Sequence, residues 1–187
     1  MPRKPFAIGE GGLVTTTDDE LAGRLARLTN FGFEDGVVDG DVGLNAKLAE
    51  WPAATALAAL DRFGEVLACR RATATRMLAD LVPHGYDHQS GSDGAAWQFV
   101  PVLAPSEAVR AAALETARRN HIELRTYYSV PLHRMPAFAA MPVAGDLRRT
   151  EVLGARVLSL PMSDDLSDAS REAIVESLVA ATRAGVG

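Results

Sequence analysis

The stretch that decides the fold is the first dozen residues, Met1-Pro-Arg-Lys-Pro-Phe-Ala-Ile-Gly-Glu-Gly-Gly12. A lysine amine such as that of Lys4 can form an imine with a carbonyl compound and act as a nucleophile. The glycines after it let the backbone turn back sharply and approach a ligand without a Cβ clash. Taken alone, the stretch also has a simpler interpretation, a hairpin turn that carries a solvated lysine.

Composition describes an ordinary globular protein. The 187 residues are 48% hydrophobic and 23% charged, which is enough to build a sizeable core. The formal net charge of −5 argues against nucleic acid as a partner, and no apolar run reaches the length of a membrane span. Without a signal-peptide core after Met1, a cytoplasmic location is expected. The single cysteine, Cys69, cannot form an internal disulfide and is expected to be a small core residue.

Local patterns in the first sixty residues predict turns and two helices. Residues 6–17, with glycines followed by Leu-Val-Thr-Thr-Thr, are typical of a β-hairpin. The aspartates at 18–19 precede leucines at helical spacing, so they are expected to cap a helix. Residues 30–43 are rich in glycine and aspartate and have no helical period, which indicates a loop. Residues 48–60 are alanine-rich and are expected to be helical, with Pro52 near the helix start.

The remaining chain is expected to alternate helices, strands and loops, which is typical of the α/β class. The expected elements are a long helix over 61–81, a strand over 97–103, a helix over 106–120 capped by Ser106, a short strand over 122–125 and a last helix from Ser167. The histidines at 84, 88 and 121 lack metal-ligand spacing and are expected at the surface.

Several motifs, in a fixed order along the chain, together resemble one family. They are Lys4-Pro-Phe with its Gly-Glu-Gly-Gly turn, Asn30-Phe-Gly-Phe33, Gly43-Leu-Asn-Ala-Lys-Leu-Ala-Glu50, Tyr127-Tyr-Ser-Val-Pro-Leu-His133 and Leu158-Ser-Leu-Pro-Met162. The family is the DegT/DnrJ/EryC1/StrS group of sugar aminotransferases, which depend on pyridoxal 5′-phosphate (PLP). The resemblance runs from Lys4 nearly to the C-terminus, and the chain looks like the second half of such a protein.

The resemblance implies an α/β fold, the C-terminal portion of a fold-type-I PLP-dependent transferase. Residues 1–60 would be the C-terminal part of the PLP-binding large domain. Residues 61–187 would be the connecting helix and the small C-terminal domain. In the family, the first half supplies the aspartate that pairs with the pyridine nitrogen, the aromatic ring that stacks on PLP and most of the central sheet. Residues 1–60 are therefore expected to depend on a partner surface for order.

By resemblance, Lys4 stands where the family's lysine holds PLP as an imine and moves a proton between the amino-acid Cα and the cofactor. The residues before it depart from the family pattern, because Met1-Pro-Arg precedes Lys4 where the family usually reads Ser-x-His-x-Thr. The family serine that helps to bind the cofactor phosphate has no counterpart. The alternative is that Lys4 marks that position made non-functional by truncation.

Three further residues take candidate roles from the resemblance. Asn45 corresponds to the asparagine that reaches the PLP phosphate of the neighbouring subunit, with an ordinary turn residue as the alternative. Tyr128 and His133 lie in the loop that faces the sugar-nucleotide substrate in the family. A histidine there hydrogen-bonds sugar hydroxyls or phosphate, or it serves as a structural cap. Lys47 has two interpretations, a contact to substrate phosphate and a solvated lysine.

Two functional hypotheses follow. The first is a PLP-dependent aminotransferase of deoxysugar biosynthesis, which acts on a nucleotide-linked keto-sugar with glutamate as amino donor. It would work as a homodimer or with a missing N-terminal half. The second is a non-catalytic remnant of that fold, serving as an interaction or dimerisation module. A third reaction, sugar dehydration, is disfavoured by Lys4, because the dehydrating relatives carry histidine at that position.

Overall fold

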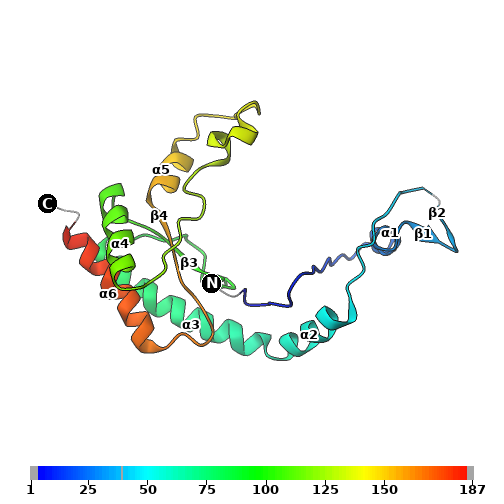
Figure 1. Cartoon of the computed structure of the whole chain (residues 1–187), viewed down its shortest axis with the longest axis horizontal. Helices are drawn as coiled ribbons and strands as arrows, with labels where there is room; N and C mark the ends of the chain where they lie inside the picture. The colour runs from blue at the N-terminus through cyan, green and yellow to red at the C-terminus, as the bar shows by residue number, and fades with distance from the viewer. Residues whose placement is uncertain (1–3, 39, 185–187) are drawn as a thin grey trace. The chain divides into compact units, whose positions relative to one another are not determined.

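The computed structural model describes residues 4–38 and 40–184, and its elements are labelled in Figure 1. Contacts within the chain divide it into two compact units. The smaller unit is Phe6–Phe63, and the larger one is Gly64–Gly187 together with the first five residues. None of the described helices is long and apolar enough to cross a membrane.

The first helix of the smaller unit, α1 (Asp19–Thr29), begins where the sequence predicts. The Asp18 carboxylate accepts a hydrogen bond of 3.0 Å from the Leu21 N–H, which satisfies one of the free donors at the helix start. The expected cap is confirmed. Acidic residues in the first turn also suit the positive end of the helix dipole.

The β-hairpin lies elsewhere than expected. Residues 6–17 form no strand, so that prediction is wrong. Instead β1 (Phe33–Glu34) pairs antiparallel with β2 (Val37–Val38), inside the segment expected to be a loop. Asp35 and Gly36 connect the strands with φ of 47° and 83°. Asp-Gly favours these two left-handed conformations, and they match the twist of a two-residue hairpin.

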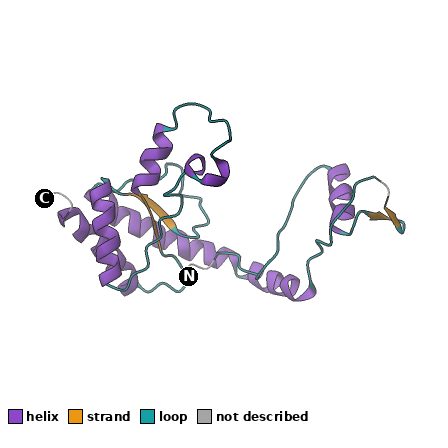
Figure 2. Ribbon diagram, turned by 45° about the horizontal axis from the view of Figure 1, so that its top comes forward, coloured by secondary structure: helices purple, strands orange, loops and turns teal. Residues whose placement is uncertain are grey.

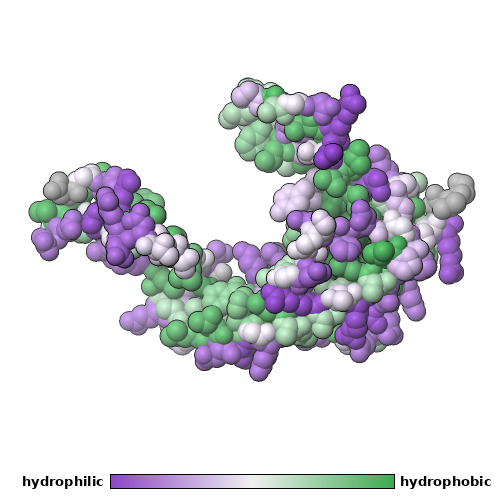
Figure 3. Space-filling view, turned by 180° about the vertical axis from the view of Figure 1, so that it is seen from behind, coloured by the Kyte–Doolittle hydropathy of each residue, from purple (hydrophilic) through white to green (hydrophobic). Residues whose placement is uncertain are grey.

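The second helix of the smaller unit, α2 (Glu50–Asp61), leaves its hydrophobic side chains in solvent. It starts after Ala49, which offers no side-chain cap. Trp51 is 85% exposed and Leu57 is 68% exposed, and Figure 3 shows hydrophobic surface along this segment. Among the described residues of the smaller unit, only Gly32 is buried. The unit therefore lacks a hydrophobic core of its own.

The larger unit contains four long helices, two strands and short helical turns among its described residues. In chain order these are α3 (Phe63–Leu81), η1 (Val82–His84), β3 (Val100–Leu103), α4 (Glu107–Arg119), η2 (Leu132–Arg134), η3 (Pro136–Phe138), α5 (Arg148–Arg156), β4 (Val157–Leu160) and α6 (Asp168–Ala184). The sequence predicts α3, α4 and α6 closely, including the cap in which the Ser106 hydroxyl accepts from the Val109 N–H at 3.1 Å. It does not predict α5, η2 or η3.

The two strands form an antiparallel pair at the centre of this unit. Val100 pairs with Leu160, and Leu103 pairs with Val157. The outer edge of each strand carries one further bridge, from Asp87 to Leu103 and from Arg125 to Ser159. The strand expected over 122–125 is therefore reduced to this single bridge. Even so, the bridge attaches the segment after residue 125 to β4.

The hydrophobic core surrounds this strand pair. α4 and α6 lie side by side next to it, and α3 completes the packing (Figure 2). Each element contributes fully or nearly fully buried side chains: Met77, Leu81, Val100, Val102, Ala113, Leu158, Leu160 and Leu178. Ile174, Val175 and Leu178 of α6 face inward.

Buried polar groups are tied to this core. The Tyr86 hydroxyl donates to the Leu178 carbonyl at 2.9 Å, and burial raises the pKa of Tyr86 well above its usual range. Arg70, which is 1% exposed, donates to the Trp97 carbonyl at 2.9 Å and to the Asp164 carboxylate at 3.1 Å. These bonds link α3 to segments far along the chain.

Cys69 corrects an expectation. It is exposed rather than a core residue, because the adjacent Arg70 takes the inward-facing position on α3. The Cys69 thiol contacts the Asp164 carbonyl at 3.3 Å.

We expect Leu178→Ala to lower the free energy of unfolding of the larger unit by about 2–5 kcal/mol, because the truncated side chain leaves a cavity among α3, α4 and the strands. Leu132→Ala is the matched control. Leu132 is 64% exposed, and its truncation should change stability by no more than about 0.5 kcal/mol. Urea unfolding followed by tyrosine and tryptophan fluorescence measures both. Equal effects would contradict the assigned core.

Candidate functional site

Lys4 is exposed at the beginning of the described chain. Its amine makes no hydrogen bond or ion pair with another described residue. The chain has only one other lysine, Lys47, and that amine is already engaged. Lys47 Nζ donates to Asn30 Oδ1 at 2.9 Å and lies 4.8 Å from the centre of the Phe31 ring. Within the described chain, Lys4 is therefore the lysine amine that is available to a carbonyl ligand.

Asn45 is placed by backbone hydrogen bonds to the end of α1. The Leu44 N–H donates to the Leu28 carbonyl at 2.8 Å, and the Ala46 N–H donates to the Thr29 carbonyl at 3.0 Å. An isolated bridge joins Asn45 itself to Asn30. The Asn45 side chain is exposed and makes no hydrogen bond to another described residue. Its amide is thus held by a fixed backbone and stays free to donate to an anion.

Gly43 lets the backbone before Asn45 lie close to the end of α1 and to Gly32. A Cβ at this position would lie 2.3 Å from the Gly32 nitrogen and 2.5 Å from the Leu28 carbonyl oxygen. Because both atoms belong to the backbone, neither can move aside cheaply. The glycine of the Gly-x-Asn motif is therefore required by packing against α1, two residues before Asn45.

Tyr128 belongs to the larger unit and begins an exposed loop. It is 79% exposed and has a φ of 64°, a left-handed conformation that is uncommon for an aromatic residue. The ring of Tyr127 lies 5.1 Å from that of Phe99 and 6.4 Å from that of Tyr128, measured between centroids. These three rings form an aromatic wall at the base of the loop.

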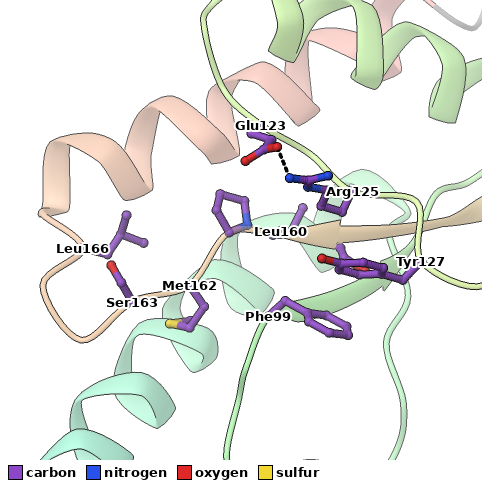
Figure 4. A pocket seen from close by; sticks show the side chains of 10 residues that line it. Phe99, Glu123, Arg125, Tyr127, Leu160, Met162, Ser163 and Leu166 are labelled. Atoms are coloured by element: carbon purple, nitrogen blue, oxygen red, sulfur yellow. Dashed lines mark ion pairs between the residues drawn. The ribbon is translucent and has the colours of Figure 1, made fainter. Parts of the chain in front are cut away.

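A pocket of about 190 Å³ adjoins this wall (Figure 4). Its lining is Phe99, Glu123, Arg125, Tyr127, Ser159, Leu160, Pro161, Met162, Ser163 and Leu166. Arg125 forms an ion pair with Glu123 at its rim, and both side chains are about half exposed. The sequence gives Arg125 only as the end of a strand. Nothing in its spacing indicates a pocket, because the lining comes from three separate segments.

His133 lies further along the same loop as Tyr128, in η2. Its Nε2 is 2.6 Å from Oε1 of Glu151, and the side chain is 18% exposed. Nε of Arg134 donates to the same carboxylate oxygen at 2.7 Å. Hydrogen bonds from Arg134 and His133 hold the pKa of the Glu151 carboxyl below its usual range. Sequence reasoning missed Glu151, which lies in the unpredicted α5.

Lys4 and Asn45 each carry a polar group of a kind that can bind part of a PLP molecule. One offers an uncommitted primary amine, and the other offers an uncommitted amide donor on a rigid backbone. Asn45 belongs to the smaller unit, whereas Tyr128 and His133 share one loop of the larger unit. Lys4 belongs to the larger unit. Taken one by one, the two donors match the chemistry of the PLP aldehyde and of the PLP phosphate.

The sequence of this chain is similar to those of several known proteins. Residues 1–179 match the profile of the DegT/DnrJ/EryC1/StrS aminotransferase family. The chain is 35% identical over 179 residues to the dTDP-3-amino-3,4,6-trideoxy-alpha-D-glucose transaminase of Micromonospora megalomicea subsp. nigra, which covers 92% of this chain and 48% of that protein. It is 33% identical over 167 residues to protein Rv3402c of Mycobacterium tuberculosis, covering 88% and 40% respectively.

Solved structures agree in fold. The crystal structure of DesI in the presence of its TDP-sugar product matches with a TM-score of 0.84 and 30% identity, covering 97% of this chain and 48% of that one. The chain spans about half the length of the curated relatives it matches. The expected fold class, a mixed α/β portion of a fold-type-I PLP-dependent transferase, is confirmed.

We expect Gly43→Ala to destabilise the smaller unit by about 1–3 kcal/mol, because the new methyl group overlaps backbone atoms of α1 and of Gly32. Gly12→Ala is the matched control, since a Cβ there meets no atom within 4 Å. Amide hydrogen exchange measures the effect as lost protection of Leu44 and Ala46. Retained protection in Gly43→Ala would contradict the close approach.

Proposed function

This chain belongs to the DegT/DnrJ/EryC1/StrS aminotransferase family, and we propose that it is the C-terminal half of a PLP-dependent enzyme that transfers an amino group to a nucleotide-linked keto-sugar. One observation carries the proposal. Of the two lysines in the chain, Lys4, which by resemblance stands at the family's imine position, has no partner among the described residues, and Lys47 is held by Asn30 and Phe31. Glutamate is the proposed amino donor, and a cytoplasmic location goes with these substrates.

Each candidate residue has one part in this proposal. When bound, PLP withdraws electrons from the amino-acid Cα, which makes the proton on that carbon removable. Lys4 would hold the cofactor covalently and, once released, its amine would move that proton from the Cα to the cofactor. Asn45 donates its amide N–H to a phosphate oxygen of the cofactor. Tyr128 and His133 bind the sugar nucleotide, with the exposed loop placing both.

The proposal also requires a partner surface. The described residues of the smaller unit form no hydrophobic core, and α2 leaves Trp51 85% exposed and Leu57 68% exposed. Large apolar side chains that stay exposed form an apolar patch, which is unfavourable in water. A second protein surface would bury this patch. We propose that an N-terminal half, encoded separately or as part of a longer chain, covers this patch. The assembly then dimerises so that Asn45 serves the neighbouring active site.

The second hypothesis, a non-catalytic interaction module, is favoured by one specific observation. The larger unit carries a hydrophobic core of its own, so its packing does not depend on a cofactor site. In that case the exposed face of α2 would serve as a docking surface, and Lys4 would have no chemical role. The two hypotheses differ in what happens when the N-terminal half and PLP are supplied.

We expect the chain, mixed with the N-terminal half of a close relative, to bind PLP with a visible absorption band that Lys4→Ala abolishes. Reduction with borohydride followed by peptide mapping should find the cofactor on Lys4. Lys47→Ala is the matched control and should keep the band, since Lys47 is bonded to Asn30. A band that survives Lys4→Ala would reject the lysine assignment. Absence of any band with both halves present would favour the interaction module.

We expect Asn45→Ala in the same assembly to weaken PLP binding by about 1–3 kcal/mol, because the cofactor phosphate loses a hydrogen-bond donor. Asn120→Ala is the control. The Asn120 amide donates to the Ser177 hydroxyl in the larger unit, so its loss should leave cofactor affinity unchanged. Fluorescence titration with PLP measures both variants. Equal affinity in Asn45→Ala and in the unsubstituted assembly would show that Asn45 is an ordinary turn residue.

A further inference from the structure

The loop that carries Tyr128 and His133 rests directly on α5. Gly154 of α5 is buried, and a Cβ there would lie 3.2 Å from the Ser129 carbonyl oxygen and 3.3 Å from that of Tyr128. It would also lie 3.4 Å from Cγ of Pro131. A helix that approaches a loop at this distance makes backbone contact, and a glycine is the residue that permits it. α5 therefore forms the platform of the loop.

Glu151 lies one turn before Gly154 on the same helix. Residues three apart share a helix face, so the carboxylate projects from the side that carries the loop. Oε1 of Glu151 receives both the His133 ring at 2.6 Å and the Arg134 guanidinium at 2.7 Å. Neighbouring residues of the loop are thus tied to one oxygen of α5.

When the ring of His133 is neutral, this arrangement decides which of its nitrogens carries the proton. A carboxylate can only accept hydrogen bonds, so the ring nitrogen that faces it must be the donor. In the neutral imidazole one nitrogen is protonated and the other is an acceptor. With the proton on Nε2, the other nitrogen, Nδ1, is the acceptor. It makes no hydrogen bond to another described residue.

We propose that Glu151 is a positioning residue, which holds the neutral His133 ring with its proton on Nε2 so that Nδ1 accepts a hydrogen bond from a sugar hydroxyl. The inference rests on the proposed function, because it assumes that this loop meets a nucleotide sugar. It adds to that function a choice between two ligand groups, a sugar hydroxyl and a phosphate oxygen. A neutral Nδ1 acceptor suits a hydroxyl, which can donate, and does not suit an ionised phosphate oxygen, which cannot.

The first test measures the tautomer of His133 in the 187-residue chain. Long-range ¹H–¹⁵N correlation spectra at about pH 8, where an ordinary histidine is neutral, distinguish the protonated ring nitrogen from the unprotonated one. His133→Gln identifies the signal among the four histidines of the chain. We expect Nε2–H alone in the unsubstituted chain and in Glu151→Gln, whose carbonyl oxygen still accepts. In Glu151→Leu we expect a mixture with the Nδ1–H form.

The control for this test is Glu176→Leu, which removes an exposed carboxylate from α6. It should leave the His133 tautomer unchanged. Unaltered signals of His84, His88 and His121 in each variant show that the fold is kept. An Nδ1–H tautomer in the unsubstituted chain, or an unchanged tautomer in Glu151→Leu, would overturn the positioning role.

The second test adds thymidine diphosphate glucose or thymidine diphosphate to the same chain. We expect only the sugar-bearing ligand to shift the Nδ1 signal, with an affinity about fivefold weaker in Glu151→Leu, the value of one hydrogen bond. An equal shift with thymidine diphosphate alone would show that Nδ1 responds to the phosphates and not to a sugar hydroxyl, which would overturn the ligand assignment. No response to either ligand would reject the proposed substrate role of the loop, whereas the tautomer result concerns Glu151 alone.

Discussion

The larger unit depends on the antiparallel pairing of β3 with β4. These strands supply the buried centre on which α3, α4 and α6 pack, and Val100 and Leu160 lie fully buried at one end of the pair. The same pairing anchors the candidate substrate loop, because within the described chain that segment bridges to a strand only from Arg125 to Ser159 of β4. A short sheet thus fixes both the core and the starting point of the loop.

The smaller unit follows a different principle. Its order comes from backbone contacts rather than from side-chain burial, since among its described residues only Gly32 is buried. Gly43 lets the chain press against the end of α1, and the resulting hydrogen bonds hold Asn45. Backbone order of this kind sets the position of a side chain without protecting it from solvent. Such an exposed but fixed position suits a side chain that, like Asn45 in the proposed function, binds a group on another subunit.

Local chemistry in the sequence predicts five of the six described α-helices, all but α5, and predicts the strands poorly. Asp18 and Ser106 mark helix starts because a capping side chain acts within three residues of its own position. Residues 6–17 resemble a hairpin in composition, but a hairpin needs cross-strand partners, and no strand forms there. Asp35-Gly36 carried the true hairpin signal inside a segment that composition alone assigns to a loop.

The residues of the candidate site also differ in whether the sequence reveals them. Lys4, Asn45, Tyr128 and His133 are recognisable from motifs that are continuous in sequence, although their assigned roles remain proposals. Glu151 and Arg125 are not recognisable, because their importance arises only when distant segments meet. Cys69 shows the limit of composition: it lies in a helix as expected, yet its neighbour Arg70 takes the buried position.

The pairing of β3 with β4 also has a consequence for the order of events during folding. Leu103 meets Val157 only after the chain has passed through all of α4, the exposed loop and α5. Contacts between residues so distant in sequence form late, because closing a long loop costs entropy before any pairing is gained. The loop with Tyr128 and His133 lies within the segment that this pairing closes. On a ribosome, it would therefore acquire its anchored form only once β4 has emerged behind it.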